Sequence, residues 1–312
     1  MRPNITSASL AIGLLSIAAL WSGRGISAAL AEPRQDTAQE MTQPAELGQV
    51  KWDRSLESAL ERATESGQPM FALFQEVPGC ATCVSFGEGP LSHPLLAEAI
   101  ETQFVPLAIF NNHPGADAEA LQRFEEPAWN NPVVRFLNAS GSDLIPREDG
   151  IYTTTKIAAR MSASLTAAER PVPAWLESLA MESRPLASAT FRTACFWQGE
   201  AHLGSIPGVA TTRAGWLGGR EVVTVRYDAD VISREQLVDR ARELRCIEEA
   251  EGNARDARSS DQHYFLRRTR LEDLDLNNVQ RTKLNALVYQ RKPLDPWLSP
   301  RQRARLAELE LE

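Results

Sequence analysis

A cysteine between a short strand and a helix is the feature that most constrains this chain. The stretch 189–200 alternates up to Ala194 and then has a helical pattern from Phe196 onward. Cys195 therefore falls on the strand-to-helix turn, where unpaired backbone N–H groups and the helix dipole favour a thiolate. Because a lone cysteine beside aromatic residues is also a common apolar core residue, spacing alone leaves that alternative open.

Length and charge limit the possible function classes. The 312 residues predict two domains, and 43% apolar with 24% charged residues is typical of a globular protein. The net charge of −8 argues against a nucleic-acid partner. The basic group at Arg267, Arg268 and Arg270 is followed by acidic residues, which favours a solvated face.

The N-terminus has the pattern of a secretory signal peptide. Arg2 precedes an apolar run from Leu10 to Trp21, which is too short to span a bilayer comfortably, and Ala29-Leu30-Ala31 is an A-x-A cleavage site. We predict a signal peptide at 1–31 and export to the periplasm or the extracellular space, with no stable membrane span after cleavage. An uncleaved anchor is the alternative.

Four cysteines remain in the mature chain: Cys80, Cys83, Cys195 and Cys246. A chain of this length needs no disulfide framework, so the cysteines indicate chemistry. Cys80 and Cys83 form a C-x-x-C pair, for which a structural metal half-site or an inert disulfide is the alternative. A zinc site needs four ligands, and the sequence has no second C-x-x-C or H-x3-H, so we predict neither metal nor cofactor.

The first half follows a polar linker at 32–48 and alternates helix with strand. The pattern predicts strands at 69–74, 104–110 and 131–137, a turn at 138–141 with 143–146 pairing back, and helices at 52–66, 94–100, 117–124, 153–165 and 167–180, with a further helix beginning near the C-x-x-C.

This order resembles the thioredoxin fold, an α/β fold, over residues 49–183. The resemblance implies that Cys80 is the attacking thiolate and Cys83 the resolving thiol, and that Pro132 is a cis-proline beside them. Thioredoxins usually have Trp before the first cysteine and Gly-Pro between the two. Here Pro78-Gly79 precede the pair, as in a thioredoxin-like group that often has selenocysteine at the first position.

Residues 187–312 predict a second domain of the α+β class with a helical C-terminal extension. The segment 221–228 alternates strictly and predicts a strand, and 232–244 predicts a helix capped by Ser233 with Gln236 three residues later. Two further helical stretches lie near 278–289 and 300–311.

This domain resembles the A-class peptide methionine sulfoxide reductases. The motif Gly-Cys-Phe-Trp-Gly with a following Glu is matched by 194–200, Gly-Tyr-x-Gly-Gly by 215–219, and the next family segments by 221–228 and 232–237. The resemblance implies that Cys195 attacks the sulfoxide sulfur, that Glu200 is the acid, and that Phe196 and Trp197 hold the methyl group.

Three departures separate the chain from that family. Trp216 stands where the family has a catalytic Tyr. The family has a longer loop between the Gly-Gly pair and the following strand, whereas this chain has only Arg220 there. The family segment Gly-Asn-Asp-x-Gly-x-Gln-Tyr has only a partial counterpart at 261–264, so Tyr264 does not match in spacing.

The leading hypothesis is an exported reductase of oxidised methionine in peptides or proteins. Cys246 would form a disulfide with oxidised Cys195, the C-x-x-C pair would reduce that disulfide, and an external thiol donor would regenerate the pair. One alternative is a thiol–disulfide oxidoreductase acting through the C-x-x-C pair, with a second domain that only binds peptides. The other is a binding or assembly protein without redox activity.

Overall fold

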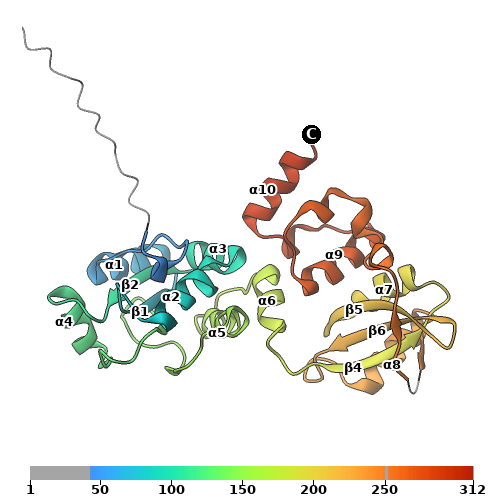
Figure 1. Cartoon of the computed structure of the whole chain (residues 1–312), viewed down its shortest axis with the longest axis horizontal. Helices are drawn as coiled ribbons and strands as arrows, with labels where there is room; N and C mark the ends of the chain where they lie inside the picture. Colours follow the sequence, from blue (N-terminus) through green and yellow to red (C-terminus); the bar gives the residue numbers. More distant parts are fainter. Residues whose placement is uncertain (1–42, 250–251, 312) are drawn as a thin grey trace, which may run out of the picture. The chain divides into compact units, whose positions relative to one another are not determined.

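The computed structural model describes residues 43–249 and 252–311 (Figure 1). The predicted signal peptide at 1–31 lies outside the described residues. Within them, no helix is long and apolar enough to cross a membrane.

The first sheet has three strands in the order β2-β1-β3. β1 (Met70–Gln75) is parallel to β2 (Val105–Phe110) and antiparallel to β3 (Val133–Leu137), which confirms the three predicted strands. Every residue of β1 is buried, because helices cover both faces of the sheet. The helices of this region are α1 (Leu56–Ser66), α2 (Ala81–Glu88), α3 (Pro94–Gln103), α4 (Ala116–Arg123), α5 (Thr154–Ala167) and α6 (Ala174–Met181).

Three boundaries differ from the predictions. Asp143 forms only a single bridge, with Leu137, so 143–146 is not a strand. The helix predicted from 167 begins at Ala174, because prolines at 171 and 173 interrupt the helical pattern. The segment predicted as linker ends in a 3-10 helix, Ala45–Leu47, which packs on α2 and is part of the folded region.

The second sheet has five antiparallel strands in the order β7-β4-β6-β5-β8. They are β4 (Ala187–Arg192), β5 (Val209–Leu217), β6 (Arg220–Tyr227), β7 (Ile247–Glu249) and β8 (Arg255–Asp256). Helix α7 (Phe196–Gly204) packs on β5 and β6, and α8 (Arg234–Glu243) lies beside β7. The predicted capping box of Ser233 and Gln236 is confirmed.

A two-residue turn joins β5 to β6. Gly218 and Gly219 have φ angles of +56° and +77°, which suit a type I′ hairpin turn. This turn brings Trp216 directly opposite Glu221.

The C-terminal extension consists of short 3-10 turns and two helices, α9 (Asn278–Gln290) and α10 (Pro300–Leu309). Helix α9 packs against α7 and β5. The extension also contacts α3, where the buried Glu98 carboxylate accepts hydrogen bonds from the Ser299 hydroxyl and, at 2.7 Å, from the Arg301 backbone N–H.

Candidate functional site

The C-x-x-C pair lies at the start of α2, directly after β1. Cys80 is the N-cap residue and is exposed, whereas Cys83 is buried. Their sulfur atoms are 3.5 Å apart, and both are free thiols. A Cβ on Gly79 would lie 2.4 Å from the Glu76 carbonyl oxygen and 2.7 Å from the Cys83 Cβ, so this turn requires glycine.

The two thiols have different acidities. The Cys83 backbone N–H hydrogen-bonds to the Cys80 sulfur and lowers the pKa of Cys80. Burial raises the pKa of Cys83 to about 11. Cys80 is therefore the more acidic thiol of the pair and the one that reaches solvent, whereas burial disfavours ionisation of Cys83.

Polar groups surround the buried thiol. Cys83 donates to the Asn131 Oδ1 at 2.8 Å, and the Asn131–Pro132 bond is cis, as predicted. The Glu76 carboxylate lies within 4.8 Å of both sulfur atoms. Among the described residues, Glu76, Cys80 and Cys83 are the one group whose spacing can hold a metal ion. They provide three ligands, one fewer than a closed zinc site needs.

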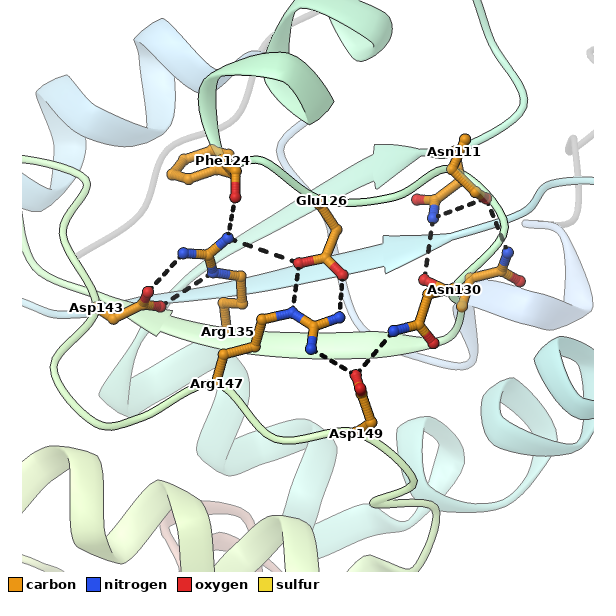
Figure 2. Close-up of polar contacts among 10 residues, drawn as sticks. Asn111, Phe124, Glu126, Asn130, Arg135, Asp143, Arg147 and Asp149 are labelled. Carbon is orange, nitrogen blue, oxygen red and sulfur yellow. Dashed lines mark hydrogen bonds and ion pairs between the residues drawn. The ribbon is translucent and has the colours of Figure 1, made fainter.

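A buried network of charges supports the loop that carries Asn131. Figure 2 shows the Glu126 carboxylate between the guanidinium groups of Arg135 and Arg147. Arg147 also pairs with Asp149, which accepts a hydrogen bond from Asn130 at 2.9 Å. The network thus connects the sheet to the residue just before Asn131 and holds that loop against the C-x-x-C turn.

The second thiol, Cys195, lies at the N-cap of α7, between β4 and the helix. It is half-buried and free. The next backbone N–H, that of Phe196, donates to the Glu221 carboxylate at 2.6 Å. Glu221 is the second residue of β6, and it brings a carboxylate to the residue that follows the thiol.

Glu200 lies on another side of α7. Five residues of helix separate it from Cys195, which corresponds to a rotation of about 140° and a rise of about 7.5 Å. Its carboxylate is fully buried and accepts hydrogen bonds from the His263 backbone N–H at 2.7 Å and the Thr212 hydroxyl at 3.4 Å. Burial raises the pKa of Glu200 to about 8, so the group is largely neutral at pH 7.

An aromatic cluster lies next to Cys195. Phe196 packs edge-on against Trp216, with ring centroids 5.4 Å apart. Trp197 stacks on Tyr264 at 4.0 Å and donates from its indole nitrogen to Asp261 at 3.3 Å. The structure therefore brings both predicted pocket residues and Trp216 together, and it adds Tyr264.

The segment 261–264 reaches this region despite its irregular spacing. Asp261 and Tyr264 contact Trp197, the Gln262 side chain bonds both backbone groups of Ala214, and the His263 backbone holds Glu200. All four residues of the segment thus contact α7 or β5.

Cys246 is buried in the core of the second domain. Its thiol donates to the Leu244 carbonyl at 3.7 Å, and burial raises the pKa of Cys246 to about 11. Arg192 of β4 pairs with Ile247 of β7. Cys246 directly precedes Ile247, and Cys195 follows Arg192 by three residues. Both cysteines are near the same end of β4.

Comparison with known proteins identifies one domain and one short similarity. Residues 51–139 match a family model described as thioredoxin-like. The chain is 41% identical over 69 residues to Peptide methionine sulfoxide reductase A5 of Arabidopsis thaliana, over 18% of this chain and 27% of that protein. The chain thus spans about a quarter of the length of this curated relative.

Two solved structures are similar to this chain. DsbH oxidoreductase has a TM-score of 0.33 and 16% identity, covering 41% of this chain and 92% of that one. A thioredoxin from Thermus thermophilus has a TM-score of 0.31 and 20% identity, covering 36% and 84%. From the family match, the chain contains a thioredoxin-like domain, and it has a short similarity to a methionine sulfoxide reductase.

Sequence reasoning missed four residues that contact either a thiol or one of the two residues after Cys195. Glu221 is the first residue of the strictly alternating segment 221–228. A carboxylate at the start of a strand, directly after a Gly-Gly turn, was the sequence signal that could have identified it as a site residue. Asp261 was noted only as part of a family remnant. Glu76 and Asn131 flank the C-x-x-C turn and the cis-proline, so their positions in the thioredoxin pattern could have identified them.

Proposed function

We propose that this protein is an exported oxidoreductase that reduces methionine (S)-sulfoxide in peptides and proteins, with Cys195 as nucleophile and the thioredoxin-like domain as reductant. The observation that carries the proposal is the arrangement around Cys195. A half-buried thiol at a helix N-cap is followed at once by Phe196, whose backbone N–H donates to the Glu221 carboxylate and whose ring packs against Trp216. These rings suit the methyl and methylene groups beside a sulfoxide, and the carboxylate suits its oxygen.

The reaction begins when the Cys195 thiolate attacks the sulfoxide sulfur. The sulfoxide oxygen needs a proton, which a nearby carboxylic acid supplies, and the oxygen ends on Cys195 as a sulfenic acid while the thioether leaves. The sulfur of the substrate is reduced and Cys195 is oxidised by two electrons. Phe196, Trp197 and Trp216 would form the apolar part of the substrate site.

Two carboxylates compete for the role of acid. Glu200 is the acid that the family resemblance implies, and its raised pKa keeps it protonated near pH 7. Glu221 has the contact next to Cys195, whereas the described partners of Glu200 lie on β5 and in the segment after β8. We assign the proton transfer to Glu221 on contact, and we assign Glu200 a positioning role through His263.

Regeneration requires further thiols. Cys246 would condense with the sulfenic acid, forming the Cys195–Cys246 disulfide and releasing water. Cys80 would attack this disulfide, and Cys83 would complete the exchange, leaving both second-domain cysteines reduced and the C-x-x-C pair oxidised. An external dithiol donor must then reduce that pair. The burial of Cys246 requires a local movement before it can react.

A second candidate is a thiol–disulfide oxidoreductase acting through Cys80 and Cys83. The observation that favours it is the complete geometry of this pair: one exposed thiol of lowered pKa lies 3.5 Å from one buried thiol. In that case the aromatic site of the second domain binds client peptides without chemistry.

The deciding experiment measures turnover of a peptide containing methionine (S)-sulfoxide, with dithiothreitol as reductant. The mature chain is compared with Cys195→Ser, Cys246→Ser and Cys80→Ser, and insulin-disulfide reduction is measured in parallel. Sulfoxide turnover that needs Cys195 supports the reductase. Because dithiothreitol also reduces a sulfenic acid directly, Cys246→Ser is assayed with a reduced thioredoxin as donor, and full turnover there would remove Cys246 from the cycle. Disulfide reduction that needs Cys80, without sulfoxide turnover, establishes the second candidate. Absence of both activities leaves a binding protein.

Export is tested separately, by mass spectrometry of the N-terminus of the protein recovered from cells. A chain that begins at Glu32 supports a signal peptide of residues 1–31. A chain that begins at Met1 contradicts it.

A further inference from the structure

A cleft of about 720 Å³ lies on one face of the second sheet. Its floor is formed by Thr211 and Arg213 of β5 and by Thr224 and Arg226 of β6. These residues alternate with side chains that enter the core, such as Val225, so all four project from the face of the sheet that does not contribute to that core. The strand register pairs each arginine with a threonine across the strands.

The C-terminal segment brings more positive charge to the same cleft. Arg267 and Arg281 are also among the residues that line it. Four arginines thus face one cleft, and Glu272 is the one carboxylate among the residues that line it. On the sheet, the two arginines occupy diagonal positions, which lie about 7–8 Å apart in an antiparallel pair, and such like charges repel each other.

Only some of these charges are neutralised. Arg267 pairs with Glu272, and Arg213 pairs with Asp256. Arg226 has no ion pair or hydrogen bond to any described residue, and Arg281 hydrogen-bonds only the Leu276 carbonyl within the described chain. Among the described residues, therefore, no carboxylate pairs with these two guanidinium groups, in a protein whose overall net charge is −8.

The pKa of a neighbouring histidine is lowered by the same positive charges. His263 also lines the cleft, and its pKa is lowered to about 4, by burial and then by the positive charges of Arg281, Arg267 and Arg213. His263 is therefore neutral near pH 7, and its ring can serve as a further hydrogen-bonding group for a bound anion.

We propose that this cleft binds a small multivalent oxyanion, an organic phosphate or a polycarboxylate. Guanidinium groups bind such oxygens with paired, charge-assisted hydrogen bonds, and Ser259 with the floor threonines supplies hydroxyl donors. The volume falls within the 300–1,000 Å³ that is usual for small-ligand sites. The net negative charge of the whole chain disfavours a long nucleic acid, so the occupant is small.

This site is separate from the sulfur chemistry. None of Cys195, Phe196 and Trp197 lines the cleft, and Glu200 is fully buried behind it. The binding proposal therefore holds or fails independently of the proposed reductase activity. Thr212 and His263 are shared residues, since both line the cleft and both donate a hydrogen bond to Glu200.

The test is isothermal titration of the mature protein with pyrophosphate and with citrate, each at constant ionic strength set with sodium chloride. The variants Arg226→Gln and Arg281→Gln remove one uncompensated charge each. Arg240→Gln is the matched control, because Arg240 is an exposed arginine on α8 paired only with Glu243. Circular dichroism checks that each variant is folded.

We expect saturable binding with one site per chain, weakened about tenfold or more in Arg226→Gln and in Arg281→Gln and unchanged in Arg240→Gln. Preference for pyrophosphate over citrate identifies a phosphate ligand, and the reverse identifies a polycarboxylate. If neither anion binds below about 10 mM, or if all three variants bind like the wild type, the proposal is wrong.

Discussion

The two thiol sites of this protein begin from the same local geometry and diverge in what surrounds the sulfur. Cys80 and Cys195 are both N-cap residues of a helix that follows a strand. At Cys80 the helix N–H groups remain available to the sulfur, and a second thiol lies 3.5 Å away. At Cys195 the first helix N–H is bound by Glu221 instead. A position at a helix N-terminus therefore does not by itself determine the chemistry of a cysteine. The groups around the sulfur determine it.

The different surroundings of the two thiols suit two different kinds of substrate. A thiol beside a second thiol exchanges disulfides, since the resolving group is already in place. A thiol beside a carboxylate and aromatic rings suits a substrate with an apolar group and an oxygen that must leave protonated.

The first prediction separates the two cysteines by substrate. With dithiothreitol as reductant, Cys195→Ser should lower sulfoxide turnover by at least about 10³-fold, because it removes the nucleophile. Cys80→Ser should leave this turnover nearly unchanged and abolish insulin reduction. Equal losses of sulfoxide turnover in both variants would show that the two sites do not divide the work in this way.

The second prediction concerns the carboxylate beside Cys195. Glu221→Gln should lower the kcat for sulfoxide reduction by about 10²–10⁴-fold, because an amide cannot supply a proton. Glu200→Gln should lower kcat by less than about tenfold, since Glu200 is largely neutral at pH 7 and an amide resembles a protonated carboxyl group.

Steady-state kinetics of the two variants side by side decide between the carboxylates. The opposite ranking would assign the proton transfer to Glu200. Because both substitutions are isosteric, a thermal melt of each variant controls for loss of structure.

The third prediction compares the buried glutamates of the two regions. Glu126 contacts two arginines, whereas the hydrogen-bond donors of Glu200 are neutral. Glu126→Gln should destabilise the protein by about 1–3 kcal/mol, because it removes the buried carboxylate that two part-buried guanidinium groups share and leaves them paired only with Asp143 and Asp149 among the described residues. Urea unfolding measures this effect. The control is Glu148→Gln, whose carboxylate is 54% exposed and pairs with Arg160, and we expect a change below about 1 kcal/mol.

Much of the fold could be predicted from the sequence because its elements are locally encoded. The strands β1, β2 and β3 are short apolar runs between turn residues. The capping box of α8 can be recognised from Ser233 and from Gln236 three residues later. The cis bond before Pro132 followed from the thioredoxin pattern. The start of α6 was wrong, because apolar periodicity extended across two prolines, and the predicted pairing of 143–146 reduced to one bridge.

The surroundings of the thiols could be predicted only in part. Phe196 and Trp197 follow Cys195 directly in the chain, so the sequence alone predicts that they lie near it. Glu221 and Tyr264 reach the same region through strand pairing and through the path of the C-terminal segment, which spacing along the chain does not encode. Glu200 looked close to Cys195 in sequence, but helical geometry turns it toward β5.

The last and smallest effect is the pH dependence of stability. The pKa of Glu200 is about 8 in the folded protein, against an ordinary value of 4.5. A raised pKa means that the stabilising contribution is complete below pH 4.5 and is lost as pH rises toward 8. The lowered pKa of His263, about 4 against 6.5, acts in the opposite direction, but only below pH 6.5. Between pH 6.5 and 8 the raised pKa of Glu200 therefore lowers stability as pH rises, and comparison with Glu200→Gln removes the contributions of other groups that titrate there, Cys80 among them.

Within that window the wild-type protein should lose about 1–2 kcal/mol of stability, and Glu200→Gln should lose much less, because its amide does not titrate. Urea unfolding at pH 6.5, 7.25 and 8 measures both slopes. The upper limit matters, because the pKa of Lys283 is lowered by burial to about 8, and its neutralisation raises stability above that pH. Parallel slopes in the two proteins would mean that Glu200 is ionised in the folded state. Glu200 would then be a buried charge like Glu126, and the contrast between the two regions would disappear.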